Sequence, residues 1–342
     1  PAGLLCSLRA GRYLFDCFVK DVNFWTSGGA RLINLWSGVP LKTFERDIDH
    51  VDNRYYQLFH GPLPVRLLYG MMMPWHLRRP HRIIAMSDET AEITRRAFDV
   101  AAEQVLITGF PRNDALLQPS SATRLPAVMQ QALDAGQRMF VYLPTFRDSG
   151  KPFVQLDWER LNAHMAKLDA VFFCKFHPVD RSQIPQGYER IRSLPQDLDV
   201  YSVLPFADAL ISDYSSIIFD YMLLERPIIY YAPDIDEFAS QNRSLNFDPR
   251  EIAVGPVCRS FEELLASLSN LQGDATDAQP AVDEQHRETV FARLHRYRDA
   301  RSCQRLLQAL AECEPLPVSG ARERSDAALD AEELHRSPQQ GE

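Results

Sequence analysis

Residues 207–238 read ADALISDYSSIIFDYMLLERPIIYYAPDIDEF, and this stretch decides the fold class. The apolar run 209–211 predicts a short buried strand, which ends at the polar pair Ser212 and Asp213. Residues 217–224 are apolar on most sides of a helix, and after a stop at Glu-Arg-Pro, residues 228–231 predict a second buried strand. The order strand, helix, strand is typical of a parallel sheet, so we predict an α/β domain.

Two serines, Ser215 and Ser216, stand between the first strand and the helix. A serine hydroxyl at this position can cap the helix, because it satisfies a backbone N–H of the first turn. The same position also suits an anion such as phosphate, since it follows the carboxyl end of a strand. The spacing alone leaves both interpretations open.

The run S-D-Y-S-S-I-I-F-D-Y at 212–221, continued by R-P-I-I-Y-Y at 226–231, resembles the signature of the CDP-glycerol glycerophosphotransferases. These are the polyol-phosphate transferases of teichoic acids and capsules. Other motifs resemble the same family and occur in the same order, over roughly residues 5–310: G-V-P-L-K at 38–42, G-F-P-R-N-D at 109–114, P-T-F-R at 144–147, K-F-H-P at 175–178 and G-P-V at 255–257.

The resemblance implies the GT-B architecture, with two Rossmann-like α/β domains facing a cleft. We expect an acceptor-side domain at 1–118, a nucleotide-donor domain at 119–285, a C-terminal helix at 286–313 and a disordered tail at 314–342. Because the chain opens with Pro rather than Met, an incomplete N-terminal domain is also an expectation.

The family pattern places a histidine, the expected general base, where this chain has Ser37. A serine hydroxyl does not accept a proton near neutral pH without a partner base, whereas imidazole does. Asp47, Asp49 or His50 could supply the base instead, and we predict Asp49 as the catalytic candidate among them.

Four residues are predicted on the acceptor side by the resemblance: Gly38, Pro40, Lys42 and Arg112. For Arg112 a structural interpretation is favoured, in which it pairs with a carboxylate while Asn113 or Asp114 caps the next helix.

Donor-binding residues are predicted at the ends of several strands: Thr145, Arg147, His177, Asp213, Ser215, Ser216 and, further along the chain, Arg305. Because the carboxyl ends of parallel strands lie at one edge of a sheet, we expect Arg147, His177 and the serine pair to converge on the donor phosphates. The resemblance also gives His177 a catalytic role. For Arg305 a solvated helix face is the alternative.

Residues 58–82 combine apolar side chains with Arg66, Arg78, Arg79 and Arg82, and no acidic residue interrupts them. Such a segment suits the surface of an anionic membrane. The alternative is a buried helix pair with basic ends. No run of 18 apolar residues and no signal peptide is evident, so we expect a cytoplasmic protein, either free or peripheral on the inner face of the cell membrane.

Composition narrows the function further. The chain has 342 residues and a formal charge of −9, which argues against general nucleic-acid binding. The six scattered cysteines show no metal-ligand spacing and indicate a reducing compartment. Neither phosphate-loop motif of NTPases or dehydrogenases occurs. The D-x-D pairs at 47/49, 197/199 and 234/236 are weak metal signals, and we predict no metal and no cofactor.

The predicted function is transfer of glycerol- or ribitol-phosphate from a CDP-activated donor to a glycan or lipid-linked acceptor, with release of CMP. Two alternatives stay open. One is a GT-B glycosyltransferase that uses a nucleotide sugar, and the other is a donor-binding protein impaired in catalysis because Ser37 replaces the base.

Overall fold

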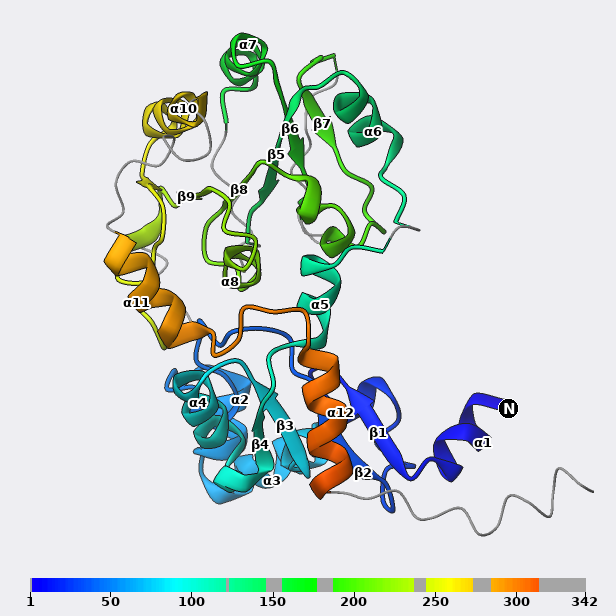
Figure 1. Cartoon of the computed structure of the whole chain (residues 1–342). Coiled ribbons are helices and arrows are strands. Elements are labelled where there is room, and N and C mark those ends of the chain that lie inside the picture. The colour runs from blue at the N-terminus through cyan, green and yellow to red at the C-terminus, as the bar shows by residue number, and fades with distance from the viewer. Residues whose placement is uncertain are drawn as a thin grey trace, which may run out of the picture. The chain divides into compact units, whose positions relative to one another are not determined.

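The computed structural model describes residues 2–120, 123–145, 156–176, 187–236, 244–272 and 284–313. The chain divides into two compact units, one ending at Cys303 and the other beginning at Gln304. The first unit holds two separate parallel sheets, which follow one another along the sequence (Figure 1).

The first sheet has the strand order β1-β2-β3-β4, with all neighbours parallel. Its strands are β1 (Arg12–Phe15), β2 (Arg31–Asn34), β3 (Arg82–Ala85) and β4 (Val105–Ile107). Helix α4 (Asp88–Phe98) packs on β3 and β4. The other helices of this part are α1 (Ala2–Arg9), α2 (Arg54–Phe59), α3 (Leu63–Met72) and α5 (Pro111–Leu117).

The second sheet has the order β10-β9-β8-β5-β6-β7, again with parallel neighbours throughout. Its strands are β5 (Arg138–Leu143), β6 (Ala170–Cys174), β7 (Ile191–Ser193), β8 (Ala209–Ser212), β9 (Ile228–Tyr231) and β10 (Val257–Cys258). Numbered within the sheet and read from β7, this is the order 3-2-1-4-5-6 of a doubly wound nucleotide-binding fold. The order reverses between β5 and β8, and ligands bind such sheets at the carboxyl ends of the strands beside that point.

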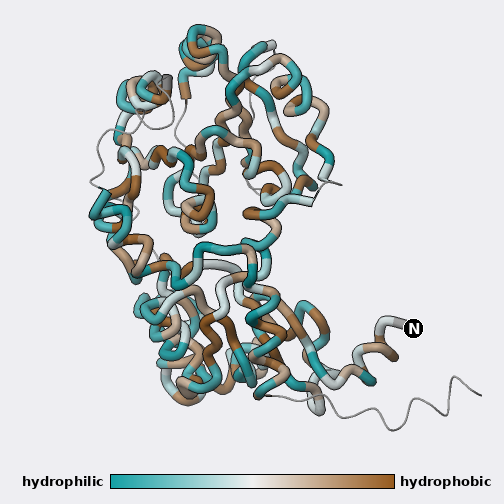
Figure 2. The backbone as a smooth tube through the Cα atoms, viewed as in Figure 1, coloured by the Kyte–Doolittle hydropathy of each residue, from teal (hydrophilic) through white to brown (hydrophobic). Residues whose placement is uncertain are grey.

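Four helices pack on strands of the second sheet: α6 (Ala127–Asp134), α7 (Trp158–Lys167), α8 (Ile217–Met222) and α10 (Phe261–Ser269). Two further helices follow along the chain, α11 (Glu284–Leu294), which contacts α4, and α12 (Ser302–Cys313). The strands of the sheets run through hydrophobic parts of the chain (Figure 2). Every residue of β6 and β9 is buried, as expected for parallel strands covered on both faces. Helix α8 is buried along its whole length, which confirms the prediction from its apolar sequence.

Ser87 caps α4: its hydroxyl accepts the N–H of Thr90, whose own hydroxyl accepts the N–H of Ser87. The prediction of a single helix over 286–313 was wrong, because the structure has two helices, α11 and α12, in this part of the chain. No Pro or Gly lies in the break. Tertiary contacts stabilise the break between the two helices. The N–H of Arg296 donates to the carbonyl of Met86, and Asp114 accepts the N–H groups of Ser302 and Cys303.

The strands of the two sheets fall on either side of the predicted boundary at 118/119, while the domain limits themselves stay predictions. None of the six cysteines forms a disulfide. Within the described residues, no helix combines the length and the apolar character needed to cross a membrane.

Candidate active site

The carboxyl ends of β5 and β8, at the reversal of strand order, are joined through one buried carboxylate. Asp213 follows β8, is 3% exposed, and accepts the backbone N–H of Thr145 at 2.9 Å and that of Tyr214 at 2.6 Å. The hydroxyl of Ser212 donates to the carbonyl of Leu143 at 2.6 Å, also across the two strand ends. These bonds hold the loop after β5 against the turn that carries Ser215 and Ser216. Asp213 and Thr145 therefore shape the predicted donor site, and direct contact of either with the donor stays a prediction.

The two serines differ in what their side chains do. The hydroxyl of Ser215 accepts the N–H of Ile217 at 3.4 Å, at the start of α8, whereas Ser216 makes no side-chain capping bond. Both residues are half-buried. The capping interpretation therefore applies to Ser215, and the Ser216 hydroxyl is not needed for the helix end.

A loop from the first sheet reaches this turn at Gly38, which has φ +155°. A Cβ atom placed on Gly38 would lie 2.6 Å from Ser216 Oγ, 2.8 Å from Ser216 Cβ and 3.2 Å from a terminal nitrogen of Arg112. Only a residue without a side chain fits this approach. The backbone beside Ser37, the predicted acceptor side, thus meets the Ser216 turn, the predicted donor side.

Arg112 is anchored across the same contact. Its Nε and Nη2 atoms donate to Asp220 Oδ2 at 3.1 and 2.8 Å, and the guanidinium lies over the rings of Phe110 and Tyr201. Burial pulls the pKa of Arg112 down, but the Asp220 carboxylate and Tyr201 outweigh it, so the pKa lies above its usual value. The favoured interpretation, that Arg112 pairs with a carboxylate, agrees with this geometry. The prediction that Asn113 or Asp114 caps the next helix is wrong, because both residues lie inside α5, whose N-cap is Phe110. Asp114 instead accepts the N–H groups of Ser302 and Cys303 at the start of α12.

The loop containing Pro40 and Lys42 is held by the segment at 244–246. The side-chain amide of Asn246 donates to the carbonyls of Pro40 at 2.9 Å and Lys42 at 3.2 Å, and Lys42 forms an antiparallel bridge with Leu245. The backbone around the predicted acceptor residues is therefore fixed by contacts that are distant in sequence.

Ser37 is exposed, and it opposes part of the rise in the pKa of the neighbouring Cys17 thiol. Burial raises the pKa of Cys17, so this thiol is protonated near neutral pH and cannot replace a histidine as base. Asp49 accepts the hydroxyl of Ser244 at 2.6 Å, which lowers its pKa and weakens it as a base. Asp47 pairs with Arg96 at 2.8 Å. The structure thus identifies none of these three residues as a replacement base, and a role of His50 as the base stays a prediction.

Three predicted donor residues cannot be placed in this site. Arg147 and His177 lie outside the described residues. Arg305 lies on α12 in the second compact unit. Their roles stay predictions. Within the described ranges, no three His, Cys, Asp or Glu side chains gather closely enough to hold a metal ion.

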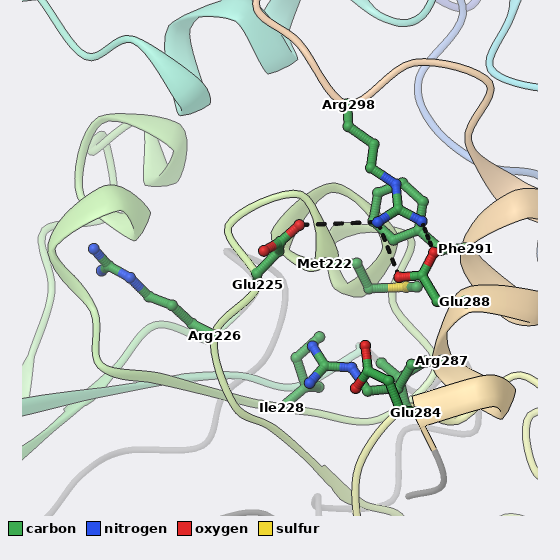
Figure 3. A pocket seen from close by; sticks show the side chains of 10 residues that line it. Met222, Glu225, Arg226, Ile228, Glu284, Arg287, Glu288, Phe291 and Arg298 are labelled. Carbon is green, nitrogen blue, oxygen red and sulfur yellow. Dashed lines mark hydrogen bonds and ion pairs between the residues drawn. The ribbon is translucent and has the colours of Figure 1, made fainter. Parts of the chain in front are cut away.

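A separate cavity of about 150 Å³ lies between the end of α8, the start of β9 and α11 (Figure 3). Three arginines and three glutamates line it: Arg226, Arg287, Arg298, Glu225, Glu284 and Glu288. Arg298 pairs with Glu288 at 2.5 Å and lies over the ring of Phe291. The acidic and basic side chains that line the cavity are equal in number. The cavity adjoins the amino end of β9 rather than the carboxyl ends of the strands. It is therefore not part of the candidate active site.

Sequence reasoning missed Cys17, Tyr201, Asp220 and His295. Asp220 left one signal, since it is a lone carboxylate in the apolar run of α8. His295 is 4% exposed, and burial lowers its pKa to about 4, against smaller opposing effects of the Asp220 carboxylate and the Phe219 backbone.

We expect the buried His295 to make the protein less stable in acid. The unfolded chain takes up a proton on this residue below its ordinary pKa of 6.5, whereas the folded protein does so only near 4. The free energy of unfolding should therefore fall by about 3 kcal/mol from pH 6.5 to pH 4 through this group alone. Urea unfolding across that range should show a flatter pH dependence for His295→Gln than for the parent. Equal slopes would show that His295 is not the group responsible.

The doubly wound sheet and the meeting of its switch point with a loop of the first sheet are those of a GT-B protein. The chain belongs to the CDP-glycerol:poly(glycerophosphate) glycerophosphotransferase family, whose family model matches residues 4–312. It is similar to the wall teichoic acid polymerase TagF, with a TM-score of 0.69 and 22% identity over 89% of this chain and 73% of that one, which confirms the fold.

Two curated relatives come from Staphylococcus aureus (strain NCTC 8325 / PS 47). The teichoic acid ribitol-phosphate polymerase TarK is 30% identical over 225 residues, covering 63% of this chain and 42% of TarK. A teichoic acid glycerol-phosphate transferase is 24% identical over 292 residues, covering 81% of this chain and 70% of the relative. The chain thus spans about two fifths of the length of TarK.

Proposed function

We propose that this chain transfers glycerol- or ribitol-phosphate from a CDP-activated donor to a hydroxyl group of a glycan or lipid-linked acceptor. The acceptor oxygen attacks the phosphorus that carries the polyol, the bond from that phosphorus to the bridging oxygen breaks, and CMP leaves with the bridging oxygen. The acceptor proton passes to a base or to water. Related proteins named as glycerol- and ribitol-phosphate transferases and polymerases support this proposal.

The observation that carries it is the contact of Gly38 with Ser216. It brings a loop of the first sheet against the turn at the switch point of the second. A donor whose phosphates lie at Ser215 and Ser216 would then have its reacting phosphorus beside Ser37, Gly38 and Arg112. Catalysis in such a site comes from positioning and from stabilising charge on the phosphoryl group. His177 and Arg147 would add donors there, as the family resemblance implies.

A panel of donors tests this function. The protein should release CMP from CDP-glycerol or CDP-ribitol in the presence of an acceptor, and it should release no nucleoside diphosphate from nucleotide sugars. Release of a nucleoside diphosphate would mean sugar transfer instead. Binding of CDP-glycerol without CMP release would support the third candidate, an impaired donor-binding protein. The exposed Ser37 at the position of the expected base, next to a Cys17 thiol whose pKa is raised by burial, is the observation that favours that candidate.

Replacing Ser216 by alanine should weaken binding of CDP-glycerol. The change removes a hydrogen bond to a charged phosphate, which is typically worth about 1.5–3 kcal/mol, so the Kd should rise roughly 10- to 150-fold. Calorimetric titration measures this directly. Ser193→Ala, at the end of the edge strand β7, is a matched control that should leave the Kd unchanged. Equal affinity of the Ser216→Ala variant and the parent would remove Ser216 from the phosphate site.

We also propose that α3 lies on an anionic membrane surface. The alternative of a buried helix pair is wrong for this helix, because α3 has no buried residue. Its apolar side chains at helical spacing are exposed, with Leu63 at 66%, Leu67 at 61% and Met71 at 75%. Met73 is buried and Trp75 is half-buried, so the exposed apolar surface of this segment is that of α3 itself. Exposed apolar and basic residues without acidic ones are suited to an anionic interface.

Binding to vesicles containing anionic phospholipid should weaken at least tenfold in Met71→Glu, because the new charge must enter the interface and is repelled by the lipid. It should also weaken with rising salt, as the attraction of Arg66 is screened. Leu133→Glu, on an exposed leucine of α6, serves as control. Equal co-sedimentation of the parent and both variants at every salt concentration would contradict the membrane proposal.

A further inference from the structure

Asp220 is a fully buried carboxylate in a helix that is otherwise apolar. Its Oδ2 atom accepts three hydrogen bonds: two from Arg112 and one from the Tyr201 hydroxyl at 2.6 Å. Replacing water around a buried carboxylate is costly, and a buried ion pair is often no more stabilising than apolar side chains of similar volume. A gain in stability therefore does not by itself explain the ion pair of Asp220 with Arg112. The geometry of the pair suggests a different role.

The partners of Asp220 come from distant parts of the chain. Arg112 is the second residue of α5, after the first sheet, while Asp220 lies on α8, after β8. Tyr201 lies on the short turn at Val200–Ser202, and its ring packs beside the guanidinium. The bond from Arg112 thus joins α5 to the helix that follows the donor turn.

The same guanidinium also touches the loop of the predicted acceptor side. The terminal nitrogen Nη2 of Arg112 that donates to Asp220 is the atom that lies 3.2 Å from a Cβ placed on Gly38. Ser216, the other neighbour of Gly38, precedes Asp220 by four residues, which is about one helical turn. Asp220 therefore fixes Arg112 at the point where Gly38 and Ser216 meet.

We propose that Asp220 is a positioning residue, which holds Arg112 so that the Ser216 turn and the Ser37–Gly38 loop keep the spacing needed for transfer. Tyr201 assists by donating to the same carboxylate oxygen. That Asp220 holds Arg112 and thereby the two loops is independent of the reaction, whereas the effect on turnover rests on the proposed function.

The test uses Asp220→Asn, which keeps the volume and removes the charge. We expect backbone amides at 36–39 and 214–219 to exchange hydrogen at least tenfold faster. With CDP-glycerol and an acceptor, kcat should fall about 100-fold, since a displacement of about 1 Å can cost that much. The Kd for CDP-glycerol should change less than about threefold, because Asp220 faces Arg112 rather than the donor.

Other variants separate positioning from general stability. Arg112→Gln should reproduce the faster exchange, and the double variant with Asp220→Asn should be no worse than either single variant, because one contact is lost in all three. Arg112→Lys keeps the charge but loses the paired geometry, so it should be impaired as well and serves if Asp220→Asn does not fold. Glu89→Gln breaks the ion pair of Glu89 with Arg293 on α11 and is the matched control, expected to leave exchange and kcat unchanged.

A lower melting temperature with unchanged exchange at 36–39 and 214–219, and unchanged kcat per folded molecule, would overturn the proposal. Additive losses in the double variant would do so too. If the parent shows no transfer, the exchange measurements still decide whether Asp220 holds Arg112 and the two loops, and the proposed function alone fails.

Discussion

Ser37→His is expected to raise turnover with CDP-glycerol by roughly 10²–10⁴-fold, the usual contribution of general-base catalysis. Ser37 is exposed, so the side chain is not confined by a packed core. Its present neighbour, the Cys17 thiol, stays protonated near neutral pH because burial raises its pKa. An imidazole at this position could accept the proton of the acceptor hydroxyl. The Kd of the donor should barely change, because the gain arises in the transition state.

The pH profile makes this expectation specific. With histidine at position 37, kcat/KM should rise with pH as the imidazole loses its proton, around a pKa of about 6.5. Ser37→Ala is the matched control and should keep the low turnover of the parent. If the parent enzyme has a high turnover and Ser37→His leaves it unchanged or lowers it, another residue is the base. The family pattern would then fail at this site.

Gly38→Ala should lower turnover by about 100-fold or more. The added methyl group would lie 2.6 Å from Ser216 Oγ and 2.8 Å from Ser216 Cβ, in a backbone conformation with φ +155° that L side chains rarely adopt. Rotation of the serine relieves the contact with Oγ but not the one with Cβ, so the loop or the turn must move. Such a displacement between donor and acceptor sides is costly because the reacting atoms must be aligned.

Steady-state kinetics measures this loss, and Gly29→Ala provides the control. Nothing lies within 4 Å of a Cβ placed on Gly29, so this variant should keep the parent turnover. If Gly38→Ala is as active as the parent, the contact between Gly38 and Ser216 is not part of the working site.

The fold was largely predictable because its signals are local. The strand, helix and strand around Ser216 follow from short apolar runs and their polar ends, and the structure confirms them. The order of the strands in the sheet cannot be predicted from such apolar runs, because it depends on which strands pair with one another after each helical crossover connection. The break between α11 and α12 was missed for a related reason: Met86 and Asp114, which accept hydrogen bonds at the break, lie 210 and 188 residues away from their partners Arg296 and Ser302.

The candidate site was predictable in its motifs but not in its contacts. The serine pair, Gly38 and Arg112 were all found from the sequence, yet nothing there shows that Gly38 touches Ser216 or that Arg112 pairs with Asp220 across 108 residues. The exposure of α3 was one of two open interpretations, because an apolar helix in a sequence looks the same whether it faces a core or a membrane.

Transfer of a polyol phosphate is tested most directly by phosphorus NMR of the protein with CDP-glycerol or CDP-ribitol and a panel of polyol-phosphate- and sugar-terminated acceptors. We predict that the phosphorus bearing the polyol appears in a new phosphodiester on an acceptor, while the other phosphorus appears in CMP in equal amount. The Ser37→His variant should reach the same products faster. A donor diphosphate that stays intact with every acceptor, for the parent and for Ser37→His alike, would contradict the proposed reaction.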